Sequence, residues 1–314
     1  MSRRRHAVIA IGAVAMVAVL VAGWLIGRPG SDSAADEPSA TPSPTPSATP
    51  TGTVPVTPSA APPSAPPTAA TPSRSAARPA PGKRWAPTPG QAWQWQLTTP
   101  VDQSVDVPVY DIDGFENSAE VVRALHAKGR RVICYVEVGA AEDFRPDHGT
   151  FPKEVLGKPN GWEGERSVDI RRLDVLGPIL AKRFDMCRQK GFDAVEPDLM
   201  ENYAIDSGFP VTAADQLRFN RFVARLAHER GMAVALKNDS GQVDELVGDF
   251  DFAVVEECAE FDECALYAPF IKAGKAVLHV EYKLAKSDFC RDTKARGFSS
   301  MRKDLDLNAA RQPC

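Results

Sequence analysis

Residues 127–139 read AKGRRVICYVEVG. The first part is typical of a helix end, because glycine readily adopts the left-handed conformation that follows a helix and a lysine there faces the negative end of the helix dipole. The second part is a short apolar run of the kind that forms a buried strand. The stretch therefore predicts a helix that ends near Gly129 and leads directly into a strand.

The same pattern of a basic or small residue, a glycine and an apolar run recurs through the second half of the chain. The copies are QKGFDAVEPD at 189–198, ERGMAVALKND at 229–239, a looser LVGDFDFAVVEEC at 246–258, KAGKAVLHVEYK at 272–283 and ARGFSSMRKD at 295–304. Two earlier runs, AWQWQLTT at 92–99 and VPVYDIDGF at 107–115, bring the expected strands to eight.

Apolar strands that alternate with helices predict a parallel sheet. Eight such units in this length predict a (β/α)8 TIM barrel. The connection at 99–107 is too short for a full helix, so we expect the barrel to be irregular there. A doubly wound open sheet is the alternative, but no glycine-rich phosphate loop follows any of these strands, which removes the usual nucleotide-binding reason for that fold.

The N-terminal region, residues 1–29, predicts a membrane or export signal. Residues 7–26 are apolar or small without a charge, follow the basic RRRH at 3–6, and are long enough to span a membrane as a helix. We expect an uncleaved signal-anchor; a cleaved signal peptide, with Ser33 and Ala35 near the cleavage site, is the alternative. Either way, the rest of the chain is predicted to be extracellular, anchored through 7–26 or secreted.

Residues 30–90 form a Pro/Ser/Thr/Ala-rich stretch. Sixteen of the 27 prolines lie at 31–90, and large apolar residues are scarce, so the stretch cannot bury enough surface to offset chain entropy. We expect a disordered, semi-rigid linker of polyproline type. It would carry one folded domain, residues 91–314, away from the membrane.

The six cysteines all lie in this domain, and an even number in an exported chain predicts disulfides. A metal site is not predicted, since no Cys-x-x-Cys occurs and the histidines are scattered. Local spacing favours one of the fifteen possible pairings: Cys258–Cys264, Cys290–Cys314 and Cys134–Cys187. In the strand at 131–137, alternation puts Glu137 with Tyr135 on one face and Cys134 on the other, toward the helix layer.

Acidic residues end most of the expected strands, at the edge where a barrel of this type has its active site. They are Asp111, Asp113, Glu137, Glu196, Asp198, Asp239, Glu256, Glu257 and Glu281. A ring of carboxylates can bind a divalent metal, split glycosidic bonds or attract a cationic ligand. Aromatic residues near the strand ends favour sugar, and Trp95, Tyr135, Trp162 and Tyr282 are among them. Nucleic acid is not an expected partner, because the net charge is −4 and no basic patch occurs in the domain.

A series of short motifs runs in order through nearly all of residues 91–314. They are WQWQL at 93–97, VYDIDGF at 109–115, CYVEVGA at 134–140, DAVEPD at 193–198, ALKND at 235–239, FAVVEEC at 252–258, the later Cys264, and VEY at 280–282. In these motifs the chain resembles glycoside hydrolase family 114. The resemblance implies a (β/α)8 barrel with endo-α-1,4-polygalactosaminidase activity. The substrate would be a partly deacetylated, and therefore cationic, polysaccharide of α-1,4-linked galactosamine.

The resemblance also implies roles for single residues. The acidic pair of the family falls on Asp198 as nucleophile and Glu256 as general acid/base, although these two roles could be exchanged. Positions that bind substrate or support the pair would be Asp111, Asp113, Tyr135, Glu137, Lys237, Asn238, Glu281, Tyr282 and Trp95. The family often has Asn after its Pro-Asp, whereas this chain has Leu199, so a polar neighbour of the nucleophile is missing.

Two other functions fit the same pattern. A non-catalytic polysaccharide-binding module of this fold would keep the aromatic residues but not need the acid pair. A metal-dependent hydrolase would lose activity to a chelator, whereas the two-carboxylate mechanism needs no metal and no cofactor. We expect a monomer.

Overall fold

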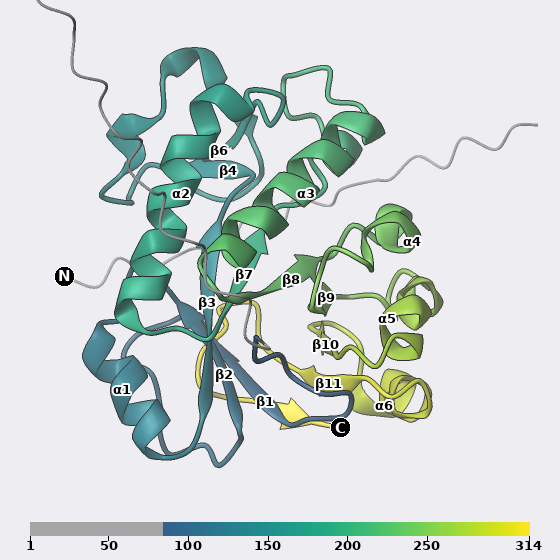
Figure 1. Ribbon diagram of the computed structural model, residues 1–314. Helices are drawn as coiled ribbons and strands as arrows, with labels where there is room; N and C mark the ends of the chain where they lie inside the picture. The colour runs from purple at the N-terminus through teal and green to yellow at the C-terminus, as the bar shows by residue number, and fades with distance from the viewer. Residues whose placement is uncertain (1–83) are drawn as a thin grey trace, which may run out of the picture. The chain divides into compact units, whose positions relative to one another are not determined.

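The computed structural model describes residues 84–314 (Figure 1). The expected membrane segment at 7–26 and nearly all of the expected linker lie outside these residues. None of the helices in 84–314 is long and apolar enough to cross a membrane. Trp85 and Ala86, which precede the expected domain start at 91, already pack against the inner core.

Eight parallel strands of the described region form one curled sheet, and their order in the sheet follows the chain. They are β1 (Trp93–Gln96), β2 (Val109–Asp113), β3 (Arg131–Glu137), β7 (Ala194–Asp198), β8 (Ala233–Lys237), β9 (Phe252–Glu256), β10 (Val277–Glu281) and β11 (Ser299–Arg302). The short β12 (Gln312–Pro313) pairs antiparallel with β11. All eight strands expected from the sequence are therefore confirmed.

The two edges of this sheet meet at β1 and β11. Trp93 Nε1 donates to Ser299 O at 2.8 Å, and Leu97 N donates to Leu307 O at 3.0 Å. Across the described residues, β1 and the chain from β11 to β12 are joined by such single bonds and not by a continuous ladder. The sheet thus curls like a TIM barrel, with a seam where the predicted barrel would be fully closed.

Helices cover the outer face of the sheet (Figure 1). The α-helices are α1 (Ala119–Ala127), α2 (Leu173–Lys190), α3 (Ala213–Glu229), α4 (Val243–Leu246), α5 (Ala268–Lys272) and α6 (Lys286–Ala295). Short 3-10 turns are η1 (His148–Thr150), η2 (Lys153–Val155), η3 (Asn202–Ala204), η4 (Ser240–Gln242) and η5 (Cys264–Tyr267). As expected, no helix separates β1 from β2. The recurrent pattern is also confirmed, since Gly129 and Gly191 after α1 and α2 have φ of 74° and 95°.

The connection from β3 to α2 contains a small antiparallel sheet that the sequence analysis missed. Its strands are β4 (Ala140–Glu142), β5 (Leu156–Pro159) and β6 (Glu165–Val168), in the order β4-β6-β5. In Figure 1, β4 and β6 lie next to α2, beyond the end of β3. This insertion adds a wall above one side of the curled sheet.

Alternation along the strands separates two apolar clusters. In β3, Cys134 and Val136 belong to the cluster between sheet and helices, whereas Ile133 belongs to the inner cluster with Trp93 and Trp95. The inner cluster fills the lower part of the curled sheet. Toward the carboxyl ends, the inward positions change from apolar to polar, which places the candidate site there.

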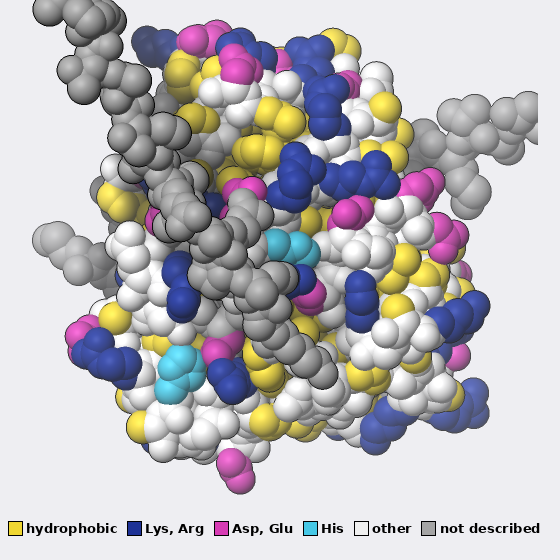
Figure 2. Space-filling model, viewed as in Figure 1, with side chains coloured by type: hydrophobic (Ala, Val, Ile, Leu, Met, Phe, Trp, Pro, Cys, Tyr) yellow, Lys and Arg dark blue, Asp and Glu magenta, His cyan; other side chains and the backbone are white. Residues whose placement is uncertain are grey.

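Three disulfides join Cys134 to Cys187, Cys258 to Cys264 and Cys290 to Cys314. This is the predicted pairing. Cys134 lies on the outer face of β3 and Cys187 on α2, so their bridge ties the sheet to its helix layer as alternation indicated. On the face shown in Figure 2, cationic side chains are interspersed with acidic and apolar ones.

Candidate active site

Lys237, the last residue of β8, lies at the centre of the polar region. Its Nζ is 2.9 Å from Asp198 Oδ1, 3.0 Å from Glu256 Oε2 and 3.3 Å from Glu196 Oε1. These three acids come from β7 and β9, the two neighbours of β8. The two residues predicted to form the acid pair are therefore held on one ammonium group.

The charge of Lys237 is stabilised by this arrangement. Its side chain is only 2% exposed, and burial by itself lowers the pKa of an ammonium. The negative charges of Asp198, Glu256 and Glu196 outweigh burial and raise the pKa of Lys237 well above its usual value. Its Nζ also lies 5.1 Å from the centre of the Trp95 ring, which adds a cation–π contact.

Asp198 is an ionised carboxylate in this setting. Tyr135 OH donates to its Oδ2 at 2.6 Å, and the backbone N–H of Leu199 donates to its Oδ1 at 2.7 Å. Burial acts to raise the pKa of Asp198, but Lys237 and the Tyr135 hydrogen bond outweigh it, and the pKa lies below its usual value. The side chain is 24% exposed, so a ligand can reach it.

Glu256 is held from two sides. Tyr282 OH donates to its Oε1, and Asn238 Nδ2 lies 3.5 Å from its Oε2. Asn238 Oδ1 in turn accepts the backbone N–H of Glu256 at 2.9 Å. Like Asp198, Glu256 keeps 24% of its side chain exposed. Its carboxylate is therefore fixed in position but open to a ligand.

The three central strands end in the same unusual way. Leu199 follows Asp198, Asn238 follows Lys237 and Glu257 follows Glu256, and these followers have φ of 58°, 49° and 55°. Non-glycine residues rarely adopt this left-handed conformation, and such outliers concentrate at functional sites. The turns redirect the backbone immediately after each inward side chain. At Leu199 this also aims the N–H at Asp198, so the backbone supplies a polar contact although the expected polar side chain is missing.

Two fully buried acids, Asp111 and Glu196, lie below the pair. Apart from the ion pair between Glu196 and Lys237, their carboxylate oxygens accept no hydrogen bond from an N–H group of the described residues. Burial, followed by the charge of Glu196, raises the pKa of Asp111 well above its usual value, and burial raises the pKa of Glu196 to about 7. The region therefore holds more carboxyl groups than its single lysine can pair with.

Comparison with known proteins identifies the family of this chain. The family model of the glycoside-hydrolase family GH114 matches residues 74–314, which is most of the chain. The chain belongs to family GH114. The resemblance stated from the sequence motifs is thus confirmed, and the chain is a glycoside hydrolase similar to the endo-α-1,4-polygalactosaminidases.

Two solved structures and one sequence relative are similar to this chain. The crystal structure of Aspergillus fumigatus Ega3 in complex with galactosamine is 35% identical, with a TM-score of 0.70 over 73% of this chain and 97% of that chain. The glycoside hydrolase domain of PelA from Pseudomonas aeruginosa shares the fold at 13% identity, with a TM-score of 0.55 over 71% of this chain and 98% of that chain. A Deinococcus radiodurans protein described as "Uncharacterized protein" is 28% identical over 224 residues, 65% of this chain and 71% of that protein.

Two residues named from the GH114 motifs support loops beside the acid pair. Asp113 accepts Arg145 Nη2 at 2.6 Å together with the backbone N–H groups of Phe115 and Glu116. Glu137 accepts the backbone N–H groups of Gly139, just before β4, and Ala140, its first residue, at 2.8 and 2.9 Å. Burial, followed by the charge of Asp198, raises the pKa of Glu137 well above its usual value. Both acids therefore fix the loops that follow their strands, at the rim of the site.

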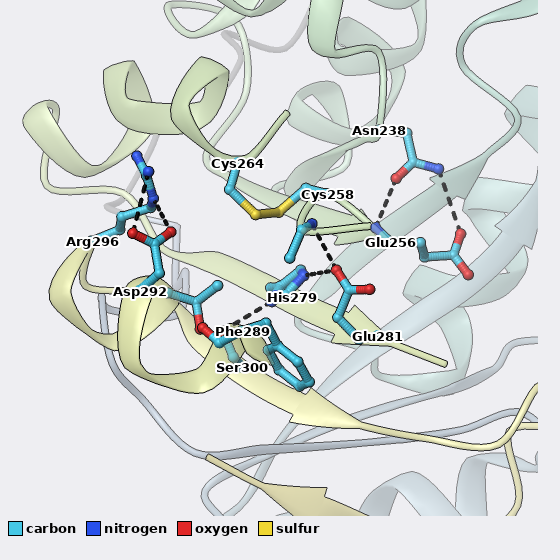
Figure 3. The surroundings of a disulfide bond; sticks show 12 residues. Asn238, Glu256, Cys258, Cys264, His279, Glu281, Phe289, Asp292, Arg296 and Ser300 are labelled. Carbon is cyan, nitrogen blue, oxygen red and sulfur yellow. Dashed lines mark hydrogen bonds and ion pairs between the residues drawn. A yellow bond between two sulfur atoms is a disulfide. The ribbon is translucent and has the colours of Figure 1, made fainter. Parts of the chain in front are cut away.

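Glu281, which the sequence motifs suggested for the site, does not lie with the other suggested residues. It is buried on the outer face of β10, where His279 Nε2 lies 2.8 Å from its Oε1 and Ala259 N donates to the same oxygen at 2.7 Å. Figure 3 shows Glu281 beside His279, with Glu256 apart from them and next to Asn238. Glu281 therefore holds the loop after β9, and Tyr282 is the residue of β10's end that faces the acid pair.

A metal centre at this loop is not supported by its chemistry. Ligand atoms of Cys258, Cys264 and His279 lie within 4.8 Å of one another (Figure 3). Both sulfurs, however, are joined in a disulfide and offer no thiolate. Two residues that the motifs did not suggest also bear on the site. Glu196 pairs with Lys237, and the charge of Asp198 acts on Glu165 of β6 without a direct contact. Glu165 belongs to the small sheet between β3 and α2, which no periodic pattern of apolar residues in the sequence predicted.

Proposed function

We propose that this GH114 enzyme cleaves α-1,4-linked galactosamine polysaccharide with Asp198 and Glu256 as its two catalytic carboxylates. One observation carries the proposal. Asp198 Oδ1 and Glu256 Oε2 lie 2.9 and 3.0 Å from the same nitrogen of Lys237. These two oxygens are therefore no more than about 6 Å apart, which is below the ~6.5–9.5 Å separation of inverting glycosidases and compatible with the ~5–5.5 Å of retaining ones.

The surroundings favour Asp198 as nucleophile. It is ionised, and three donors hold its oxygens toward the open side of the sheet. In the first step, Asp198 attacks the anomeric carbon while Glu256 gives a proton to the departing glycosidic oxygen. In the second step, Glu256 takes a proton from water as that water displaces Asp198 from the sugar. Lys237, in contact with both carboxylates, offsets the negative charge of whichever is ionised.

The excess of buried acid supports a cationic substrate. Three carboxyl groups, from Glu196, Asp198 and Glu256, share the single ammonium of Lys237 within the described site, and Asp111 is buried near Glu196. A protonated amino sugar would bring a second positive charge to this region. The solved relative Ega3 has been crystallised with galactosamine, an amino sugar of this kind.

The setting we propose for the reaction is extracellular. Three disulfides within 84–314 fit an oxidising compartment. Residues 7–26 would serve as anchor or export signal, 30–90 as a spacer and the rest as a monomeric catalytic domain.

The test is to incubate the protein, with its disulfides intact, with partly deacetylated α-1,4-galactosamine polymer and detect released oligosaccharides by mass spectrometry. Wild type should release products, and Asp198→Asn and Glu256→Gln should each abolish release while still binding polymer. Proton NMR of the first products should show the α anomer. Binding without release by wild type would instead support the non-catalytic module, and loss of activity in a chelator would support the metal-dependent hydrolase.

A further inference from the structure

The insertion between β3 and α2 contains a cavity of about 460 Å³. Its wall includes Asp143, His148, Trp162, Glu163, Glu165 and Arg166. This volume falls within the ~300–1,000 Å³ range of small-molecule sites. None of these residues belongs to the acid pair or its immediate contacts, so the cavity is a separate feature of the fold.

Trp162 presents an open aromatic ring to this cavity. The residue is 56% exposed, although an indole of this size usually buries most of its surface. The turn that carries it is nevertheless well held, because Trp162 N donates to Asn160 Oδ1 at 3.1 Å and Glu165 N donates to Trp162 O at 3.2 Å. An exposed ring on a fixed turn is suited to stacking against the flat face of a ligand.

Glu165 connects the cavity to the catalytic centre. Asn160 Nδ2 donates to its Oε2 at 3.1 Å, so one side chain ties this carboxylate to the Trp162 turn. Burial raises the pKa of Glu165 to about 7, and the Asn160 hydrogen bond acts against this rise. The backbone places β6 beside the end of β7, because Gly139 N donates to Asp198 O at 3.2 Å and Val168 N donates to Gly139 O at 3.0 Å. The cavity therefore adjoins the bond-cleaving site.

The charges of the wall select a type of ligand. Three acids, Asp143, Glu163 and Glu165, face a single arginine, Arg166, among the described residues of the wall. The carboxylate of Asp143 packs against Gly164, where an added Cβ would lie 2.5 Å from its Oδ1. Gly164 thus leaves room for this acid at the cavity. An aromatic face combined with surplus negative charge fits a ring that carries an ammonium group.

We propose that this cavity is an additional sugar subsite, in which Trp162 stacks on one amino-sugar unit of the polymer while Asp143 and Glu165 pair with its ammonium group. The proposal rests on the function given above, because it takes the polymer from that function. It does not depend on which catalytic role Asp198 or Glu256 has. The subsite would hold a unit beyond the two that flank the cleaved bond.

The consequence is a dependence on substrate length. Only a chain long enough to reach the cavity from the acid pair gains from Trp162. For such chains Trp162→Ala should lower kcat/KM by about 3- to 30-fold, the range expected for an aromatic contact with a cation. For the shortest oligomer that is cleaved, the same substitution should leave kcat/KM unchanged.

The experiment uses the full chain and α-1,4-galactosamine oligomers of increasing length. Trp162→Phe, which keeps an aromatic ring, should retain most of the activity on long oligomers. Leu266→Ala is the matched control, since Leu266 is a 48% exposed apolar residue on η5, and it should change nothing. Equal losses at every length for Trp162→Ala, or no loss at any length, would overturn the subsite.

A second arm tests the charges. In an Asp198→Asn background, calorimetry should show that Glu165→Gln and Asp143→Asn weaken binding of long deacetylated oligomers but not of fully N-acetylated ones. Equal weakening of both would rule out recognition of the ammonium group. The two proposals fail separately. Cleavage by wild type that is indifferent to Trp162 rejects the subsite alone, whereas Trp162-dependent binding without cleavage rejects the proposed function alone.

Discussion

Replacing Lys237 by methionine, which keeps the length of the side chain but removes its charge, should destabilise the protein in a pH-dependent way. The substitution leaves three carboxylates without the cation that each now contacts within 3.3 Å. Removing one partner of a buried ion pair costs about 3–5 kcal/mol. Asp198 and Glu256 are each 24% exposed, so water screens them in part. We therefore expect a loss of stability at the lower end of this range, about 3 kcal/mol at pH 8.

The sign of the pH effect follows from proton binding. Without the lysine, the pKa values of the carboxylates rise in the folded state, so the folded variant binds more protons than the unfolded chain. Its stability is then lost as pH rises, and protonation at low pH removes most of the penalty. The loss relative to wild type should therefore shrink from about 3 kcal/mol at pH 8 to about 1 kcal/mol at pH 5, at 1.36 kcal/mol for each unit of pKa change.

Urea unfolding followed by circular dichroism at both pH values measures this difference. Lys272→Met, at an exposed lysine of α5, is the matched control and should change stability by less than about 0.5 kcal/mol at either pH. An equal loss at pH 5 and pH 8 would show that Lys237 contributes by packing. A loss below 1 kcal/mol at pH 8 would refute the charge-balance reasoning altogether.

Three further predictions test single contacts. Glu196 has a pKa of about 7 in the folded protein, so it contributes stability at low pH that is lost as pH rises from about 4.5 to 7. Glu196→Gln should remove this loss, which is on the order of 3 kcal/mol. Free energies of unfolding measured across that pH window check this. Tyr135→Phe removes a donor that lowers the pKa of Asp198, so the acidic limb of the kcat/KM profile should move to higher pH; an unmoved limb would contradict Asp198 as the group that must be ionised. Leu199→Val places a β-branched residue at φ 58° and should lower the free energy of unfolding, measured in urea, by about 1–2 kcal/mol, whereas Leu199→Gly should not.

Six of the eight main strands were predictable because each combines two local signals, a glycine after a helix and an apolar run, and β1 and β2 were predictable from their apolar runs alone. The insertion was not predictable in this way. β4, β5 and β6 are only three or four residues long, and β5 reads LGKP, which shows no alternation of apolar and polar residues. Their positions are set by contacts with the rest of the fold. Glu165 and the cavity beside it were missed for the same reason.

Within the site, the sequence predicted which residue types are present better than it predicted the direction in which each side chain points. Glu281 and Tyr282 are adjacent, so only one of them can face inward from the end of β10. Strands of a parallel sheet are buried on both faces, and the VLHVE of β10 gives no clear polarity from which to choose. The joining role of Lys237 was also not visible in the sequence. Its partners Asp198, Glu256 and Glu196 are 39, 19 and 41 residues away in the chain, and they meet it only when the strands of the sheet assemble.

The seam between β1 and β11 has a consequence for how the chain reaches its native state. Trp93 and its acceptor on Ser299 are 206 residues apart in sequence. During synthesis, β1 leaves the ribosome long before the strand opposite it, and contacts of such long range form slowly. Until β11 arrives, WQWQ is an open edge strand able to pair with another chain. Productive folding therefore depends on how fast the last strand arrives relative to collisions between unfinished chains.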